Sequence, residues 1–108
     1  MLSRAEKYQA DDKVKVYAYS ERGEYKGIIV FKIKDKTAEI LDIAVKPEYQ
    51  GKGIGSRLIN YIFSKFQVNK ITAETDDDAI GFYKKYGFTV IDTRVEIYTK
   101  RYTCVKNK

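Results

Sequence analysis

The stretch of residues 39–58 constrains the fold more than any other part of the chain. An apolar run ends at Pro47, a loop with three glycines follows, and apolar residues at helical spacing begin at Ile54. This order predicts a strand, a tight turn and the N-terminus of a helix. The first N–H groups of a helix lack internal partners and lie at the positive end of its dipole, so such a place binds anions.

The patterns on either side of this stretch predict a single domain with a mixed sheet. Alternating apolar and polar residues indicate strands, and apolar residues spaced by four indicate a helix with one face on the sheet. The predicted elements are strands at 13–19, 25–34 and 37–45, a helix at 54–66, a strand at 70–75, a helix at 78–86, and strands at 88–92 and 94–105. Short turns make the first three strands an antiparallel meander, and a helical crossover places the fourth parallel to the third.

The fold class is therefore α+β (mixed α/β), with residues 1–108 as one domain. The residues at the two ends carry weaker signals. Residues 3–10 fit a short helix or an irregular segment equally well, and residues 106–108 are expected to fray.

The composition excludes several classes of chemistry. The chain has no histidine and one cysteine, Cys104, so it can build neither an internal disulfide nor a Cys/His metal site. Acid–base chemistry must then use carboxylates, tyrosine, lysine or water. A net charge of +6 favours an anionic partner. No apolar leader or run of membrane-spanning length is present, so the expected location is the cytoplasm and no membrane partner is expected.

The glycine loop at residues 51–56 differs from two common phosphate-binding loops. It is not a Walker loop, because no Gly-Lys-Ser/Thr closes it, and its G-x-G-x-G spacing is not the dinucleotide fingerprint. A glycine turn without any ligand is the alternative that these six residues leave open.

Two motifs resemble the GNAT superfamily of N-acetyltransferases. Residues 50–55, Gln-Gly-Lys-Gly-Ile-Gly, match its Gln/Arg-x-x-Gly-x-Gly/Ala pattern, and they lie between a strand and an amphipathic helix. Residues 76–88 resemble its second motif, N-x-x-A-x-x-F-Y-x-x-x-G-F. The resemblance covers roughly residues 25–98, and the two motifs occur in the family's order.

The resemblance implies acetyl-CoA as co-substrate. In the family, the strand equivalent to 39–45 splays from its neighbour, its backbone bonds the pantetheine arm, and the loop amides hold the pyrophosphate. Lys52 and Arg57 would add positive charge nearby, and Gln50 would help shape the loop. The cofactor-binding residues implied in this way are Ile43, Ala44, Val45, Gln50, Gly51, Lys52, Gly53, Ile54, Gly55, Ser56, Asp76, Ala79, Phe82 and Tyr83.

The resemblance also implies catalytic residues. Tyr83 matches the family tyrosine that acts as general acid to the CoA thiolate; a core aromatic ring is the alternative. Glu39 aligns with the catalytic glutamate of the histone-modifying branch, and Asp42 or a water chain could serve as the base instead. Without a bulge, strand alternation places Glu39 and Asp42 on opposite faces.

The chain departs from the family pattern at two places. Asp76 stands where Asn is usual, and only about a dozen residues precede the first predicted strand, where the family has a strand and two helices. This short front predicts an acceptor pocket that is open, completed by a second subunit, or suited to a peptide or protein amine.

These features predict direct acetyl transfer from acetyl-CoA to a primary amine through a tetrahedral intermediate. The acceptor is a small molecule or a protein. One alternative is a non-catalytic CoA-binding regulatory module. A basic nucleic-acid-binding domain ranks last, because no such motif is present and the lysines are scattered. Exposed strand edges near both termini favour a homodimer.

Overall fold

A computed structural model of the chain describes residues 13–108, so the alternatives for residues 3–10 lie outside it. Six strands form one mixed sheet in the order β1-β2-β3-β4-β6-β5. The elements are β1 (Val14–Glu21), β2 (Glu24–Lys34), β3 (Thr37–Val45), the short 3-10 helix η1 (Pro47–Tyr49), α2 (Ile54–Lys65), β4 (Lys70–Thr75), α3 (Ile80–Lys85), β5 (Thr89–Glu96) and β6 (Thr99–Asn107). The predicted α+β class, the antiparallel meander and the parallel β3–β4 pair are all confirmed.

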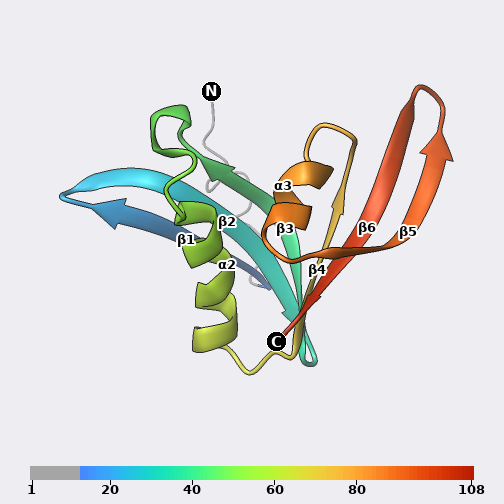
Figure 1. The fold of residues 1–108 in the computed structure, drawn as a ribbon. Coiled ribbons are helices and arrows are strands. Elements are labelled where there is room, and N and C mark those ends of the chain that lie inside the picture. Colours follow the sequence, from blue (N-terminus) through green and yellow to red (C-terminus); the bar gives the residue numbers. More distant parts are fainter. Residues whose placement is uncertain (1–12) are drawn as a thin grey trace.

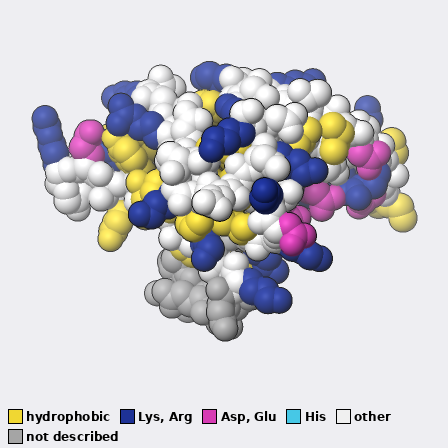
Figure 2. Space-filling view, turned by 90° about the horizontal axis from the view of Figure 1, so that it is seen from below, with side chains coloured by type: hydrophobic (Ala, Val, Ile, Leu, Met, Phe, Trp, Pro, Cys, Tyr) yellow, Lys and Arg dark blue, Asp and Glu magenta, His cyan; other side chains and the backbone are white. Residues whose placement is uncertain are grey.

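Both helices lie on the same face of the sheet (Figure 1). The apolar side of α2, with Ile54, Leu58, Ile59 and Ile62, is buried against the sheet. Its sheet-side neighbours include Ile29, Phe31, Ile40 and Ala73, and α3 adds Tyr83 to the same core. Figure 2 shows Lys and Arg side chains spread over the visible face, with most of the visible Asp and Glu toward the side of β5 and β6.

The last hairpin differs from the prediction. The sequence predicted a break near Thr93, but β5 continues to Glu96 and the turn falls at Ile97 and Tyr98. Neither residue is a typical turn former, and Tyr98 adopts a positive φ of 70°. The break was predicted too early because Asp92 and Thr93 resemble the end of a strand, whereas a bulge at Ile91 lets the ladder continue.

Two other boundaries also differ from the prediction. Helix α3 begins at Ile80, because the Asp76 carboxylate accepts hydrogen bonds from the N–H groups of Asp78 and Ala79 and holds a turn there. The C-terminus does not fray: β6 runs to Asn107, and Lys106 donates to the carbonyl of Tyr86 at 2.7 Å.

Strands β3 and β4 separate partway along their length. Their parallel ladder runs from the pair Thr37–Lys70 to the pair Ile40–Ala73 and then stops, although both strands continue. On the other side of β3 the ladder to β2 remains closed as far as Val45. Figure 1 shows the two strands diverging in the direction of α3.

A β-bulge coincides with this separation. Phe31 pairs with Ile40 and Val30 pairs with Asp42, so Leu41 is an extra residue in β3. A bulge bends the strand that carries it and increases its twist. Because Leu41 directly follows the last pair with β4, the bend accounts for the point at which β3 leaves its neighbour.

None of the helices within residues 13–108 is long and apolar enough to cross a membrane.

Candidate active site

The gap between β3 and β4 forms a cleft of about 700 Å³. Its walls come from the open edge of β3, the loop before α2, the end of β4, and α3. The predicted residues that line it are Ile43, Ala44, Val45, Gln50, Gly51, Ile54, Gly55, Asp76, Ala79, Phe82 and Tyr83. Lys52, Gly53 and Ser56 belong to the same loop without lining the cleft, and Glu39 does not line it either.

The glycine loop presents backbone N–H groups at the start of α2. Gly51 and Gly53 adopt φ angles of 78° and 82°, a region that glycine occupies without strain. The first helical hydrogen bond runs from Arg57 N to Gly53 O at 3.0 Å. Within residues 13–108, the N–H groups of 51–56 have no backbone acceptor outside the strand ladders and helices. They therefore offer a set of donors at the positive end of a helix.

Gln50 ties the loop to the strand before it. Its amide Nε2 donates to the carbonyl of Val45 at 3.1 Å. This bond joins the end of β3 to the beginning of the glycine loop, as the sequence resemblance suggested for Gln50. The loop is thereby held close to the open edge of β3.

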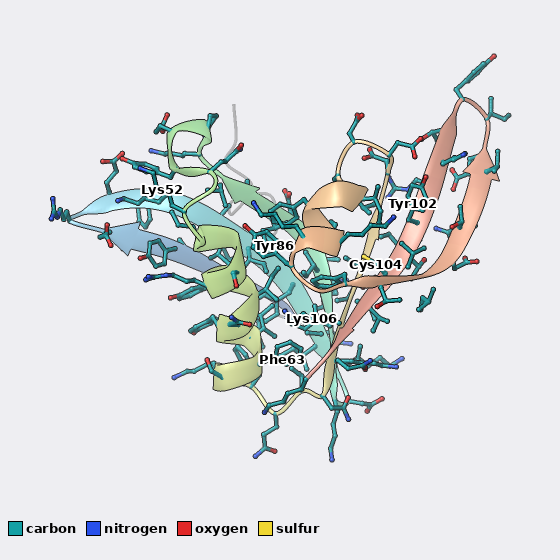
Figure 3. All side chains as sticks on the ribbon, viewed as in Figure 1. Lys52, Phe63, Tyr86, Tyr102, Cys104 and Lys106 are labelled. Carbon is teal, nitrogen blue, oxygen red and sulfur yellow. The ribbon has the colours of Figure 1, made fainter. Side chains whose placement is uncertain are left out.

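The ring of Tyr49, which lies just before the loop, has two lysine ammonium groups over it. The ammonium of Lys26 lies 4.4 Å from the ring centroid of Tyr49, and that of Lys52 lies 6.0 Å from it. The Tyr49 hydroxyl donates to Glu24 at 2.7 Å, and this bond raises the pKa of Tyr49. Lys52, labelled in Figure 3, projects near the loop and adds positive charge beside the amides.

Among the tyrosines that line the cleft, Tyr83 has the pKa that is raised most. The residue is 6% exposed. Burial raises its pKa to about 12, with smaller contributions from Cys104 and Asp42. Its ring packs edge-on against Phe82 and Phe88, at centroid distances of 5.3 and 5.2 Å. The phenol is therefore protonated at neutral pH and held in one orientation at the wall of the cleft.

Helices α2 and α3 make close contact at Gly55. A Cβ built on Gly55 would lie 3.1 Å from the rings of both Phe82 and Tyr86. Tyr86 is labelled in Figure 3 between the two helices. Glycine at this position allows the N-terminus of α2 and the helix that carries Tyr83 to form adjacent walls of one cleft.

The bulge changes which face of the sheet the candidate bases occupy. Glu39 pairs with Lys32 and Asp42 with Val30, and Lys32 and Val30 lie on one face because they are two residues apart. Glu39 and Asp42 therefore share the face opposite the helices. Regular alternation without a bulge predicted that they would lie on opposite faces. Asp42 lines the cleft and is partly buried, and Glu39 is exposed and lies outside the cleft.

Sequence reasoning missed several residues of the cleft. Tyr49, Glu74, Thr75, Tyr86 and Arg101 line it as well. Arg101 comes from β6, which joins the site only because β6 pairs with β4 in the sheet order. Tyr86 lies one helical turn after Phe82, so the spacing of the second motif was the signal that could have found it.

In a comparison with protein-family models, residues 12–90 match the acetyltransferase (GNAT) domain. The chain belongs to the GNAT acetyltransferase family. Both motifs that resembled this family in the sequence border the cleft, and the matched range includes the loop at 50–55 and the segment 76–88 as far as β5.

Curated relatives that match part of the chain are N-acetyltransferases by name. The N-alpha-acetyltransferase RimI of Mycobacterium tuberculosis is 36% identical over 63 residues, which are 56% of this chain and 40% of RimI. An uncharacterized N-acetyltransferase, ycf52, of Gracilaria tenuistipitata is 35% identical over 54 residues, 47% of this chain and 30% of its own length. The match thus spans less than half the length of either relative.

Solved GNAT structures share the fold. A GNAT family acetyltransferase from Elizabethkingia anophelis with acetyl-CoA bound has a TM-score of 0.77 and 23% identity, covering 98% of this chain and 84% of its own. The ribosomal-protein-S18-alanine N-acetyltransferase of Escherichia coli has a TM-score of 0.74 and 19% identity, covering 89% and 70%.

Proposed function

We propose that this protein transfers the acetyl group of acetyl-CoA to a primary amine. The observation that carries the proposal is the interrupted β3–β4 ladder, which opens next to a helix N-terminus whose amides have no backbone acceptor among the described residues. An unpaired strand edge bonds an extended amide chain as it would bond another strand, which suits the pantetheine arm along Ile43, Ala44 and Val45. The amides of 51–56 suit the pyrophosphate.

The transfer needs a neutral amine, a donor to the developing oxyanion and stabilisation of the leaving sulfur. The amine nitrogen attacks the thioester carbon, and collapse of the tetrahedral intermediate breaks the C–S bond. A backbone N–H on the open edge of β3, near Val45, is suited to the oxyanion. Asp42, or a water molecule that it holds, is better placed than Glu39 to accept the proton from the amine, because Asp42 lines the cleft.

Tyr83 is proposed to assist the leaving sulfur as the general acid. Its pKa of about 12 keeps the proton available at neutral pH. Full transfer of that proton to a thiolate of ordinary pKa, near 8.5, is uphill by about 5 kcal/mol, so the phenol acts mainly through a hydrogen bond that strengthens as charge develops on sulfur. The base takes one proton from the amine and the thiolate gains one, so the products of the transfer are the amide and the CoA thiol.

Acetyl-CoA binding and turnover test this proposal separately. Acetyl-CoA at about 100 times its Kd should stabilise the chain by about 2.7 kcal/mol, which a thermal shift detects. Gly53→Val should weaken this shift, because valine is strained at a φ of 82°. No shift with the unsubstituted chain would overturn the proposal.

Thiol release with a panel of amines measures turnover. Tyr83→Phe should lower kcat by about 10- to 100-fold with an unchanged thermal shift, since a hydrogen bond to a charged group contributes about 1.5–3 kcal/mol. Tyr61→Phe is the matched control, because Tyr61 stacks on Tyr17 away from the cleft. Binding of acetyl-CoA without acetylation of any amine would favour the CoA-binding regulatory module instead.

A further inference from the structure

Arg101 is a cleft-lining cation without a counter-charge in the part of the chain that the structure describes. It lies on β6 and is partly buried. Neighbouring cations are engaged: Arg94 forms an ion pair with Glu74, and Lys106 donates to the carbonyl of Tyr86. A guanidinium that is partly removed from water without a partner is unfavourable unless an anion joins it.

Acids on β4 and in the segment directly after it already have partners. Glu74 is bound by Arg94. The carboxylate of Asp76 accepts two backbone N–H groups, and that of Asp77 accepts the hydroxyl of Tyr102. The ligand that completes the cleft is therefore the natural source of the missing anion.

Strand register places Arg101 on the sheet face opposite the helices. Cys104 and Ala73 pair with each other and belong to the core under α2 and α3. Three residues before Cys104, Arg101 points to the other face, as does Arg94, its partner across the β5–β6 ladder. Asp42 shares this face because of the bulge at Leu41.

The proposed cofactor contacts lie on the helix face. The loop at 51–56 leads into α2, Tyr83 lies on α3, and the open edge of β3 lies on the opposite side of the gap from β6. The anion that meets Arg101 thus belongs to the acceptor rather than to the phosphates of the cofactor.

We propose that Arg101 determines specificity, by selecting acceptors that carry a carboxylate beside the reacting amine. This inference rests on the proposed function. The planar guanidinium matches a carboxylate through two parallel hydrogen bonds. Asp42, across the gap on the same face, meets the amine end. An acceptor of the amino-acid class presents both charges and fits between these two residues.

Matched acceptors test the proposal with the full chain. Each free amino acid is compared with its carboxamide as acceptor, with acetyl-CoA as donor, and kcat/KM is measured for both. The unsubstituted protein should prefer the carboxylate by about 10- to 100-fold, as expected for a charged hydrogen-bonding pair. Arg101→Gln should abolish this preference by raising KM for the carboxylates, and Arg101→Lys should restore part of it.

Lys100→Gln is the control, because Lys100 is an exposed neighbour on β6 that does not line the cleft. It should keep the full preference. Three results would overturn the proposal: an undiminished preference in Arg101→Gln, no preference or no acetylation of amino acids in the unsubstituted protein, or a rise in KM for acetyl-CoA in place of that for the acceptor. The thermal shift with acetyl-CoA distinguishes these results from failure of the proposed function, because that shift should be equal in all four proteins.

Discussion

Ile40 and Ala73 form the last pair of the parallel ladder between β3 and β4, and both side chains are buried beneath the helices. The two strands are thus fixed together at their core end and separate directly beyond it. The cleft is open because β3 and β4 diverge beyond this buried, apolar pair. This geometry makes the open edge of β3 the natural place to observe ligand binding.

Amide hydrogen exchange should respond to acetyl-CoA along this open edge. We expect slower exchange for residues 41–45 when acetyl-CoA is added, because the proposed ligand supplies acceptors that β4 does not. The paired segment 37–40 is already bonded on both sides and should change little. Mass spectrometry of the two segments measures the difference. Equal protection in both would contradict binding in the gap.

Gly55→Ala should destabilise the protein by about 1–3 kcal/mol, because the new methyl group overpacks against two aromatic rings. Those rings belong to Phe82 and Tyr86, each 3.1 Å from the position of the Cβ. Gly81→Ala provides the control: nothing lies within 4 Å of its Cβ, and the residue is in α3. It should stabilise the protein by about 0.5–1 kcal/mol. Urea unfolding of both variants measures the two effects, and equal stabilities would show that the helices do not make the close contact.

The stability of the protein should fall between pH 10 and pH 12 partly because of Tyr83. Its pKa is raised from 10.0 to about 12 in the folded chain, so the unfolded chain loses this proton first as the pH rises. The contribution is complete below pH 10 and lost by about pH 12, and two pKa units correspond to about 2–3 kcal/mol.

Tyr83→Phe removes the titrating group and should show a shallower decline over the same range. Denaturant unfolding of the two proteins at pH 9, 10, 11 and 12 measures the difference. Parallel curves would mean that the Tyr83 phenol is not buried as described.

Asp42→Asn should lower kcat/KM by about 100-fold or more, because general base catalysis typically contributes 10²–10⁴. Glu39→Gln is the matched control on the same face of β3, outside the cleft, and its activity should remain within about twofold of the unsubstituted protein. Initial rates at fixed, saturating acetyl-CoA measure both variants. A larger loss in Glu39→Gln would assign the base to Glu39.

The fold was largely predictable from local patterns. The bounds of β3 and β4 agree with the prediction, because alternation and flanking turns are encoded within a few residues. The hairpin at Ile97 and Tyr98 was not predictable, since its turn lacks the residues that favour turns and follows from pairing with β6.

The candidate site was predictable where it consists of contiguous motifs. The glycine loop and the segment around Tyr83 both line the cleft, and both were singled out by the motifs that resemble the family. The position of Arg101 at the cleft could not be predicted, because its strand β6 lies between β4 and β5 in the sheet. This strand order is a feature of topology that neighbouring residues in the sequence do not encode. Whether Glu39 and Asp42 share a face of the sheet depends on a single bulge, which no local sequence pattern predicts.

The presence of Leu41 decides which of two sheets the chain forms: one with a gap between β3 and β4, or one with a continuous β3–β4 ladder. Deleting it would leave Ile40 opposite Phe31 and Asp42 opposite Val30, so every side chain would keep its face. The strand would straighten, and its ladder with β4 could close past Ala73. We expect a more stable protein that no longer takes up acetyl-CoA. In this chain, one extra residue opens a binding cleft in a sheet that would otherwise be continuous. The backbone hydrogen bonds that a closed β3–β4 ladder would have made are lost.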